Sequence, residues 1–383
     1  MIITRRERAA VFLLGFAAFL PLYAPQSVLP RMAEALGVSV GATGAVIGAT
    51  TLAVALAAPV AGPLTDRFGR KRAMLAALAA LGPLTAVLAL CGTLDQVLLA
   101  RFLQGLALPA LLTGAVAYIS RRWPGVQSAA VMGGFVGGSA MGGFAGRFVA
   151  GLFGDWFGWQ AGFAALAALS LACWPVVRAW LPADAPQADI RLSEHLRASW
   201  RHLGDSRIRA AALFGTTVLF AMTGTLSYVG FRLAGPPFDL GSAEIGLVFL
   251  VYPLGAAMAP LSGRLLRRLA VRRAILVAVG LCWTGLALLL IGKIAAVMAG
   301  IAVFISGIFL CQSLALGYVG RTARFSPGAA AGLYVCCFYV GGSLGAVVPG
   351  LLWPVHGWTG CVVLIGIIQL MGVIISSRMS ERP

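Results

Sequence analysis

The sequence has few charged residues, and acidic residues are the scarcest of them. Only 11% of its 383 residues are charged, and 12 Asp and Glu stand against 29 Lys and Arg, whereas 60% of the residues are hydrophobic. A soluble domain carries about 25% charged residues, so this chain lacks the polar surface that a water-soluble fold needs. With a mean hydropathy of +0.92, it is predicted to be an all-α membrane protein.

Motifs that would indicate nucleotide-driven or hydrolytic chemistry are also missing. The sequence has no Walker loop, no HExxH, no CxxC and no G-x-S-x-G, so we expect neither an enzyme nor an ATP-driven pump, and no cofactor. Its seven cysteines lie in or beside apolar runs without metal-ligand spacing, which indicates packing residues rather than disulfides or a metal site. The net charge of +17 is divided into short clusters between apolar runs. This pattern favours the lipid bilayer as a partner and not nucleic acid.

Apolar runs predict where the chain crosses the membrane. A bilayer requires about 20 apolar residues per helix, and runs of that kind cover 10–31, 43–63, 73–92, 96–119, 127–151, 159–180, 208–232, 243–266, 273–292, 295–319, 329–352 and 358–378. The first run has no A-x-A cleavage site and is interpreted as a retained helix rather than a signal peptide. We therefore predict twelve transmembrane helices: six in residues 1–181, a polar cytoplasmic linker at 182–207, and six in residues 208–383.

The distribution of basic residues predicts the orientation of the chain. If the N-terminus lies in the cytoplasm, most Lys and Arg fall in cytoplasmic segments or at cytoplasmic helix ends, as the positive-inside rule requires. The exceptions are Arg31, Arg101, Arg147, Arg232 and Lys293. We therefore expect both termini to be cytoplasmic.

The two halves of the sequence resemble each other. GPLTDRFGRKR begins at Gly62 and GRLLRRLAVRR at Gly263, and a Gly-Trp pair begins at Gly158 and again at Gly357, so both features recur about 200 residues apart. Two six-helix bundles related by a parallel repeat are the organisation of one large class of transporters. In that class the substrate site lies between the bundles, near the membrane midplane.

Three stretches resemble the major facilitator superfamily. GPLTDRFGRKR, which follows the second predicted span, resembles the signature loop of the family, and LLARFLQGLALPA at 98–110 resembles the fourth-helix motif of its proton-linked members. In the fifth span, Gly133, Gly142 and Gly146 resemble the antiporter motif of drug exporters, although Arg147 stands where that motif has Pro. Nearly the whole chain is similar to the YnfM-type subgroup of transporters, which implies a bacterial inner (plasma) membrane.

The resemblance implies alternating access, in which one bundle rocks against the other. The gating loop would comprise Gly62, Asp66, Arg67, Gly69, Arg70 and Lys71. Asp66 and Arg70 would latch the cytoplasmic side in the outward-facing state, and Asp66 is placed to pair with a helix N-terminus across the bundle interface. The second copy has Leu266 and Arg267 near the aligned position, so its latch would be weaker or would use another partner.

Polar residues inside the spans are the candidates for a transport site, because burying them in lipid is costly. The coupling candidates are Arg101, Gln104, Arg147 and Arg232, and the substrate-cavity candidates are Tyr23, Gln26, Tyr118, Tyr228, Tyr252, Gln312, Tyr334 and Tyr339. Each group has an alternative reading. The arginines can snorkel to the membrane interface, the glutamines can join neighbouring helices, and the tyrosines can be packing residues.

These features favour a secondary active transporter for a small organic solute, with proton-coupled efflux as the leading interpretation and the proton gradient as its energy source. No Asp or Glu falls in the middle of a span, so a cation would find no fixed countercharge, and a neutral or anionic solute is favoured. Import by symport or uniport stays open because the Gly-Pro pair is altered. The remote alternative is a receptor that does not transport, although no output domain is visible. We expect a monomer.

Overall fold

The computed structural model describes residues 3–123, 125–184, 192–259 and 261–379, and within them every regular element is a helix. Eight of the helices in these ranges are long and apolar enough to cross a membrane. They are α3 (Val40–Phe68), α4 (Arg70–Leu88), α5 (Leu94–Arg122), α7 (Trp159–Trp180), α9 (Ser206–Ala234), α13 (Val271–Leu288), α14 (Ile294–Thr322) and α15 (Pro327–Ser376). Gly357 interrupts α15 with a φ of 54°, so α15 consists of two consecutive helices that match the last two predicted spans.

The fifth predicted span is a single long helix, α6 (Val126–Phe157), but the first and eighth spans are interrupted. The first comprises α1 (Arg5–Phe19), the 3-10 helix η1 (Ala24–Ser27) and α2 (Leu29–Leu36). The eighth comprises α10 (Ser242–Val248), the 3-10 helix η2 (Phe249–Val251), α11 (Tyr252–Ala256) and α12 (Leu261–Leu266).

Proline accounts for the position of these interruptions. Pro21 and Pro25 have no N–H to donate to the helical ladder, and α1 ends at Phe19, just before the first of them. Pro253 lies in the first turn of α11, where a missing N–H is tolerated. Apolar composition located both spans, but the expectation of one continuous helix in each was wrong.

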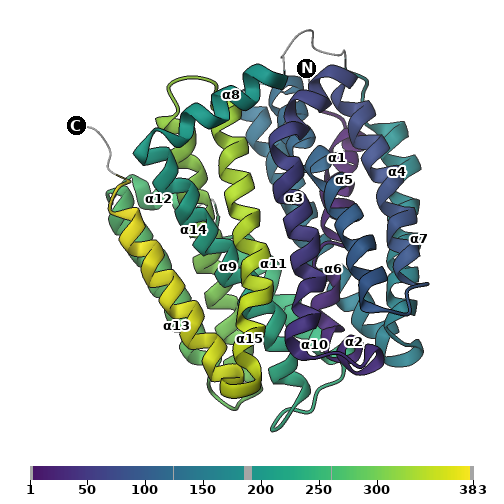
Figure 1. Cartoon of the computed structure of the whole chain (residues 1–383). Helices are drawn as coiled ribbons and strands as arrows, with labels where there is room; N and C mark the ends of the chain where they lie inside the picture. Colours follow the sequence, from purple (N-terminus) through teal and green to yellow (C-terminus); the bar gives the residue numbers. More distant parts are fainter. Residues whose placement is uncertain (1–2, 124, 185–191, 260, 380–383) are drawn as a thin grey trace.

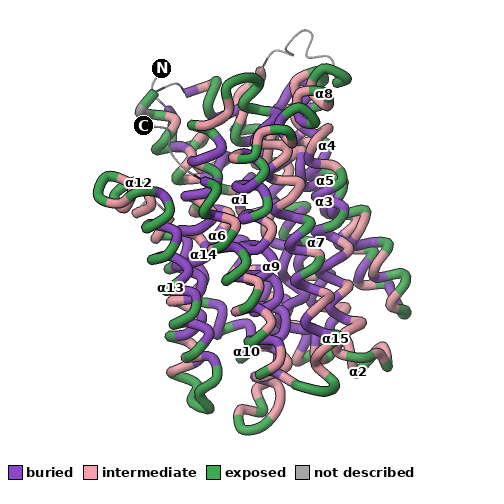
Figure 2. The backbone as a smooth tube through the Cα atoms, turned by 60° about the vertical axis from the view of Figure 1, so that its left-hand side comes forward, coloured by how far each residue is buried: buried purple, intermediate pink, exposed green. Residues whose placement is uncertain are grey.

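The helices form two groups that correspond to the two halves of the sequence. Figure 1 shows α1 to α7 on one side and α9 to α15 on the other, with α3 and α15 side by side between them. Figure 2 shows buried stretches on the inward faces of the helices and exposed stretches on the outside. The predicted fold, a helical membrane protein built from two six-helix bundles, is confirmed; the domain limits at 181 and 208 stay predictions.

The two halves approach each other most closely at one end. We call the end that carries α8 (Leu192–Leu203) the α8 end, and the opposite end, where α2 and α10 lie, the α10 end (Figure 1). A side-chain carbon at Gly44 of α3 would lie 2.1 Å from the carbonyl oxygen of Ala346 of α15. One at Gly151 of α6 would lie 2.2 Å from that of Ser242 of α10. Only glycine permits such close backbone approach, so the α10 end is closed.

The α8 end is less tightly packed along α6. A side-chain carbon at Gly133, Gly134 or Gly137 of α6, or at Gly263 of α12, would meet no atom within 4 Å. The close glycine contacts between the halves therefore lie at the α10 end, whereas these glycines at the α8 end are not held against a neighbouring helix.

The predicted linker contains a helix that the sequence reading did not anticipate. Residues 185–191 of the linker lie outside the described residues, but α8 follows them and packs against the start of α15. The Ser199 hydroxyl donates to the carbonyl oxygen of Ala329 at 3.4 Å, and the His202 ring stacks on Phe325 with ring centres 4.1 Å apart. α8 also contacts α3, so it bridges the two halves.

Candidate functional site

The interruptions in the first and eighth spans lie around Arg147, which α6 contributes. Tyr23 precedes η1, Phe249 begins η2 and Tyr252 begins α11. The centres of these three rings lie 5.3, 4.7 and 4.9 Å from the central guanidinium carbon, within cation–π range. Arg147 is fully buried, so it does not snorkel to the membrane interface.

Hydrogen bonds connect Arg147 to both halves of the molecule. Its Nε and Nη2 both donate to Oε1 of Gln26, at 2.9 and 2.6 Å, and its Nη1 donates to the carbonyl oxygen of Gly143 at 2.6 Å. The Gln26 amide donates in turn to Oγ of Ser227 on α9, at 3.1 Å. The Ser27 hydroxyl donates to the carbonyl oxygen of Arg147 at 2.6 Å. α6, η1 and α9 therefore meet in one buried polar network.

No carboxylate balances the charge of Arg147 within the described residues. The ion pairs there join Arg31 to Asp155, Arg70 to Asp66 and Arg122 to Glu7, and none of them includes Arg147. The same part of the chain holds no group of three or more His, Cys, Asp or Glu that could bind a metal ion. The site therefore presents a desolvated cation to neutral acceptors only.

Arg101 is a second buried guanidinium, but its surroundings differ. It is fully buried on α5 and donates to the carbonyl oxygens of Pro21, Leu22 and Val46, at 2.8, 2.5 and 3.2 Å, and to Oε1 of Gln104 at 2.8 Å. Two of these carbonyls belong to the proline interruption after α1, where helical N–H partners are missing. Arg101 thus stabilises the interruption that places Tyr23 and Gln26 beside Arg147, and it does not snorkel either.

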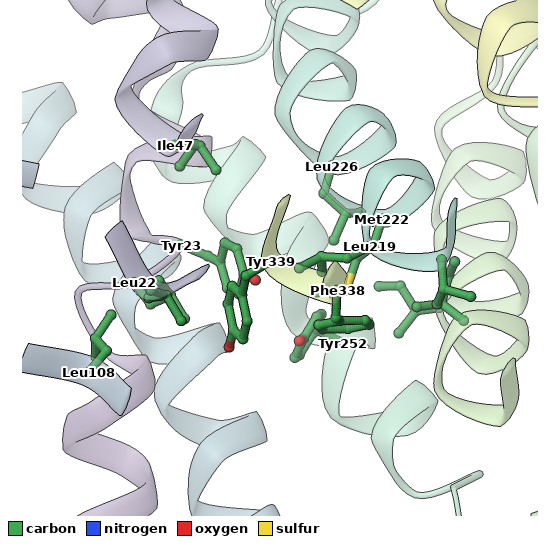
Figure 3. Close-up of a cluster of buried hydrophobic side chains, with 14 of the residues drawn as sticks. Leu22, Tyr23, Ile47, Leu108, Leu219, Met222, Leu226, Tyr252, Phe338 and Tyr339 are labelled. Atoms are coloured by element: carbon green, nitrogen blue, oxygen red, sulfur yellow. The ribbon is translucent and has the colours of Figure 1, made fainter. Parts of the chain in front are cut away.

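Aromatic and apolar side chains from both halves continue the site. Figure 3 shows Tyr23 and Tyr339 side by side, with Phe338, Tyr252 and Met222 next to them. All five are buried, between 2% and 6% exposed. Three of the predicted cavity tyrosines therefore fall in one cluster that adjoins Arg147.

Two other predicted cavity residues lie elsewhere. Tyr118 is near the α8 end, where its hydroxyl donates to the carbonyl oxygen of Pro182 at 2.7 Å. The Tyr228 hydroxyl donates to the carbonyl oxygen of Ala346 at 2.7 Å, in the closed contact between α9 and α15. Both hydroxyls are engaged by backbone, which indicates a structural role.

The remaining candidates are also separate from the Arg147 network. Tyr334 stacks on Phe338 with ring centres 5.8 Å apart. Gln312 is half-buried on α14 and, among the described residues, forms no hydrogen bond with that network. Arg232 is partly exposed and donates to the carbonyl oxygen of Pro236 at 3.1 Å.

The predicted gating loop is ordered by contacts within the first half. Asp66 pairs with Arg70, at 2.6 Å, and not with a helix N-terminus of the other half as we expected. Asp184 from the linker accepts from the N–H groups of Arg70 and Lys71, both at 3.0 Å, and so caps the N-terminus of α4. The Lys71 ammonium donates to the carbonyl oxygen of Leu181.

The glycines and the exposed arginine of this loop have distinct positions. Gly69 adopts a φ of 88° between α3 and α4, a conformation that favours glycine. Gly62 has open space beside it within α3. Arg67 is exposed, with its guanidinium 5.8 Å from the centre of the Phe68 ring.

Asp155 is a functional candidate that the sequence did not single out. At the end of α6 it accepts from the N–H groups of Ser242 and Ala243, at 2.9 and 2.8 Å, and it pairs with Arg31 of α2 at 2.8 Å. It therefore joins the two halves at the closed α10 end. Its position three residues before the repeated Gly-Trp pair is the only signal in the sequence.

Comparison with known proteins identifies this arrangement. The sequence profile of the Major Facilitator Superfamily matches residues 11–346. The chain belongs to that family. It is therefore a membrane transporter for a small molecule and not an enzyme.

Individual relatives cover nearly the whole chain. The inner membrane transport protein YnfM of Escherichia coli is 27% identical over 98% of this chain and 91% of its own length. The uncharacterized MFS-type transporter YybF of Bacillus subtilis is 26% identical over 98% of this chain and 94% of its own. A crystal structure of the nucleoside transporter NupG has a TM-score of 0.80 at 14% identity, over 98% of this chain and all of that one, a likeness that concerns the fold alone.

Proposed function

We propose that this transporter exports a small neutral or anionic organic solute from the cytoplasm in exchange for protons. The observation that carries the proposal is the placement of Arg147 where the interrupted first and eighth spans meet, bonded to groups of both halves. A site shared by both bundles changes its contacts when one bundle rocks against the other, as alternating access requires. The positive-inside distribution assigns the α8 end to the cytoplasm, so the described state would take up solute there.

The charge of the site supports the class of solute. A buried cation that no carboxylate neutralises repels a cationic solute. It adds no electrostatic penalty to the binding of a neutral or anionic solute. The resemblance of 98–110 to the fourth-helix motif of proton-linked members supports proton coupling. Arg101 is the charged residue of that motif, and it stabilises the interruption after α1. It is therefore a candidate for coupling proton movement to the site around Arg147.

Import by symport or uniport is the second candidate function. It is favoured by α6, which runs unbroken from Val126 to Phe157 because Arg147 stands where the antiporter motif has Pro. The Gly-Pro pair that bends this helix in drug exporters is thus missing from α6.

Everted membrane vesicles test the proposal. We would acidify their lumen by respiration, follow the gradient with an acridine dye, and add a panel of cationic, neutral and anionic compounds. Export predicts that neutral or anionic compounds collapse part of the gradient, and that Asp66→Asn vesicles do not respond. If no compound acts there, while an imposed gradient drives uptake into right-side-out vesicles, the chain is an importer.

A further inference from the structure

We propose that Arg147 binds the carboxylate of a small aromatic monocarboxylic acid, which displaces the Gln26 side chain from the guanidinium. This inference rests on the proposed transport function and narrows its substrate to one chemical class. It starts from the two hydrogen bonds that Arg147 donates to a single oxygen of Gln26.

The bonded edge of the guanidinium has the shape that a carboxylate requires. Nε–H and Nη2–H of arginine point in parallel and match the two oxygens of a carboxylate in a bidentate pair. In this structure both donors converge on one neutral oxygen, Oε1 of Gln26, at 2.9 and 2.6 Å. The Gln26 amide therefore offers one neutral oxygen to a pair of donors that can bind the two charged oxygens of a carboxylate.

Arg101 shows what a saturated buried guanidinium looks like in the same molecule. Its nitrogens donate to three different backbone carbonyls and to Gln104, and each acceptor is a separate atom. Because those carbonyls belong to the folded backbone, they cannot move aside for a ligand. Gln26, in contrast, is a side chain whose amide has one further hydrogen bond, to Ser227 at 3.1 Å. Of these two guanidiniums, only Arg147 has its Nε and Nη2 bonded to a side chain that can move aside, because the Nε and Nη2 of Arg101 donate to backbone carbonyls.

The faces of the guanidinium favour an aromatic acid. Tyr23, Phe249 and Tyr252 already lie within 5.3 Å of its central carbon, and the cluster in Figure 3 continues toward Phe338 and Met222. Such walls accept a ring by offset or edge-to-face packing. They offer no second cation, since Arg101 is saturated, so a monocarboxylate fits better than a dianion.

Access is consistent with loading from the α8 end. Gly143 lies one turn of α6 from Arg147, on the α8 side. A side-chain carbon at Gly143 would lie 3.4 Å from the Tyr252 ring and 3.5 Å from Nη1 of Arg147, so these two groups occupy the space beside the glycine. Further along α6, Gly133 and Gly137 adjoin open space. The free space along α6 therefore lies on the α8 side of Arg147, and the Tyr252 ring stands between it and the guanidinium at Gly143.

The test uses the purified full-length chain in lipid nanodiscs with benzoate, benzamide and benzylamine as probes of equal ring size. We expect benzoate to bind at least tenfold more tightly than benzamide, and benzylamine to bind no better than benzamide. Gln26→Glu supplies an internal carboxylate to Arg147, so it should raise the melting temperature while weakening benzoate binding at least tenfold. Gln96→Glu makes the same chemical change at an exposed position in the first turn of α5, and should leave benzoate binding within twofold of the parent.

Three results separate the inference from the transport function. Equal affinity for benzoate and benzamide, or benzoate binding unchanged by Gln26→Glu, would overturn the carboxylate site. If that happens while neutral compounds still collapse the gradient in everted vesicles, proton-coupled export stands and only the solute class is wrong. If no compound of the panel acts in those vesicles although benzoate binds as expected, the carboxylate site stands and export is wrong.

Discussion

Asp155 should control how often the α10 end opens. Asp155→Asn keeps the shape of the side chain but removes its charge, and its amide would face one of the two N–H groups that the carboxylate now accepts, those of Ser242 and Ala243. A hydrogen bond to a charged group contributes about 1.5 to 3 kcal/mol. The pair with Arg31 adds only about 0.5 kcal/mol, because the Arg31 side chain is 43% exposed. We expect Asp155→Asn to reduce the free-energy difference that favours the closed α10 end by about 2 kcal/mol, which corresponds to an increase of about 30-fold in the open population.

Cysteine labelling measures this population. In a chain whose seven native cysteines are replaced, Ser242→Cys places a thiol at a position that is 3% exposed under Asp155. With fast closing, the labelling rate by a membrane-impermeant maleimide follows the open population, so Asp155→Asn should accelerate it about 30-fold. Asp95→Asn makes the same charge change at an exposed position of the same end and should have no effect. A rate in Asp155→Asn within twofold of that control would refute the reasoning.

Three further predictions concern stability and pH. Gly146→Ala should lower the melting temperature by several degrees, because its new carbon would lie 1.9 Å from the carbonyl oxygen of Leu20, just after α1, whereas Gly137→Ala, which faces open space, should not. Arg101→Met should cost about 3 kcal/mol or more, measured as chemical denaturation in detergent, since buried acceptors lose their donor; an unchanged midpoint would contradict this role. Burial lowers the pKa of His195 below its ordinary value, with a smaller opposing effect from Asp66. The docked α8 therefore favours the neutral ring, and docking weakens as pH falls below about 6.5. Limited proteolysis of the linker should be faster at pH 5.5 than at pH 7.5, and a His195→Gln chain should lose that difference.

Much of the fold could be predicted because apolar length is a local property. The runs at 43–63 and 295–319, for example, lie within the single helices α3 and α14. The interruptions could not be placed as surely, because Pro109 lies inside an intact α5 whereas Pro21 and Pro25 coincide with a break. The difference depends on whether neighbours supply partners for the freed carbonyls, as Arg101 does after α1.

The site was only partly predictable for a related reason. Tyr23, Gln26 and Arg147 were candidates, but burial and snorkelling cannot be distinguished for an arginine near a helix end without its partners. Those partners are distant in sequence: Gln26 precedes Arg147 by 121 positions. Ser227 and Phe249 were missed because nothing in the sequence separates them from packing residues, and α8 was missed because its short amphipathic helix lies within a polar segment.

Arg147 stands where the antiporter motif has Pro, and the irregular backbone near it belongs to other spans. Gly138, Gly142 and Gly146 each approach a backbone carbonyl of α1, or of Leu20 just after it, so closely that a side-chain carbon would lie within about 2 Å of it, so α6 and α1 are held together along a glycine stripe. α6 is continuous from Val126 to Phe157, and the irregular backbone lies instead at η1 and η2, on both sides of Arg147. A continuous helix thus carries the charge while two interrupted spans carry the groups that cover it. Under the proposed alternating access, movement of either interruption would expose the guanidinium without breaking α6.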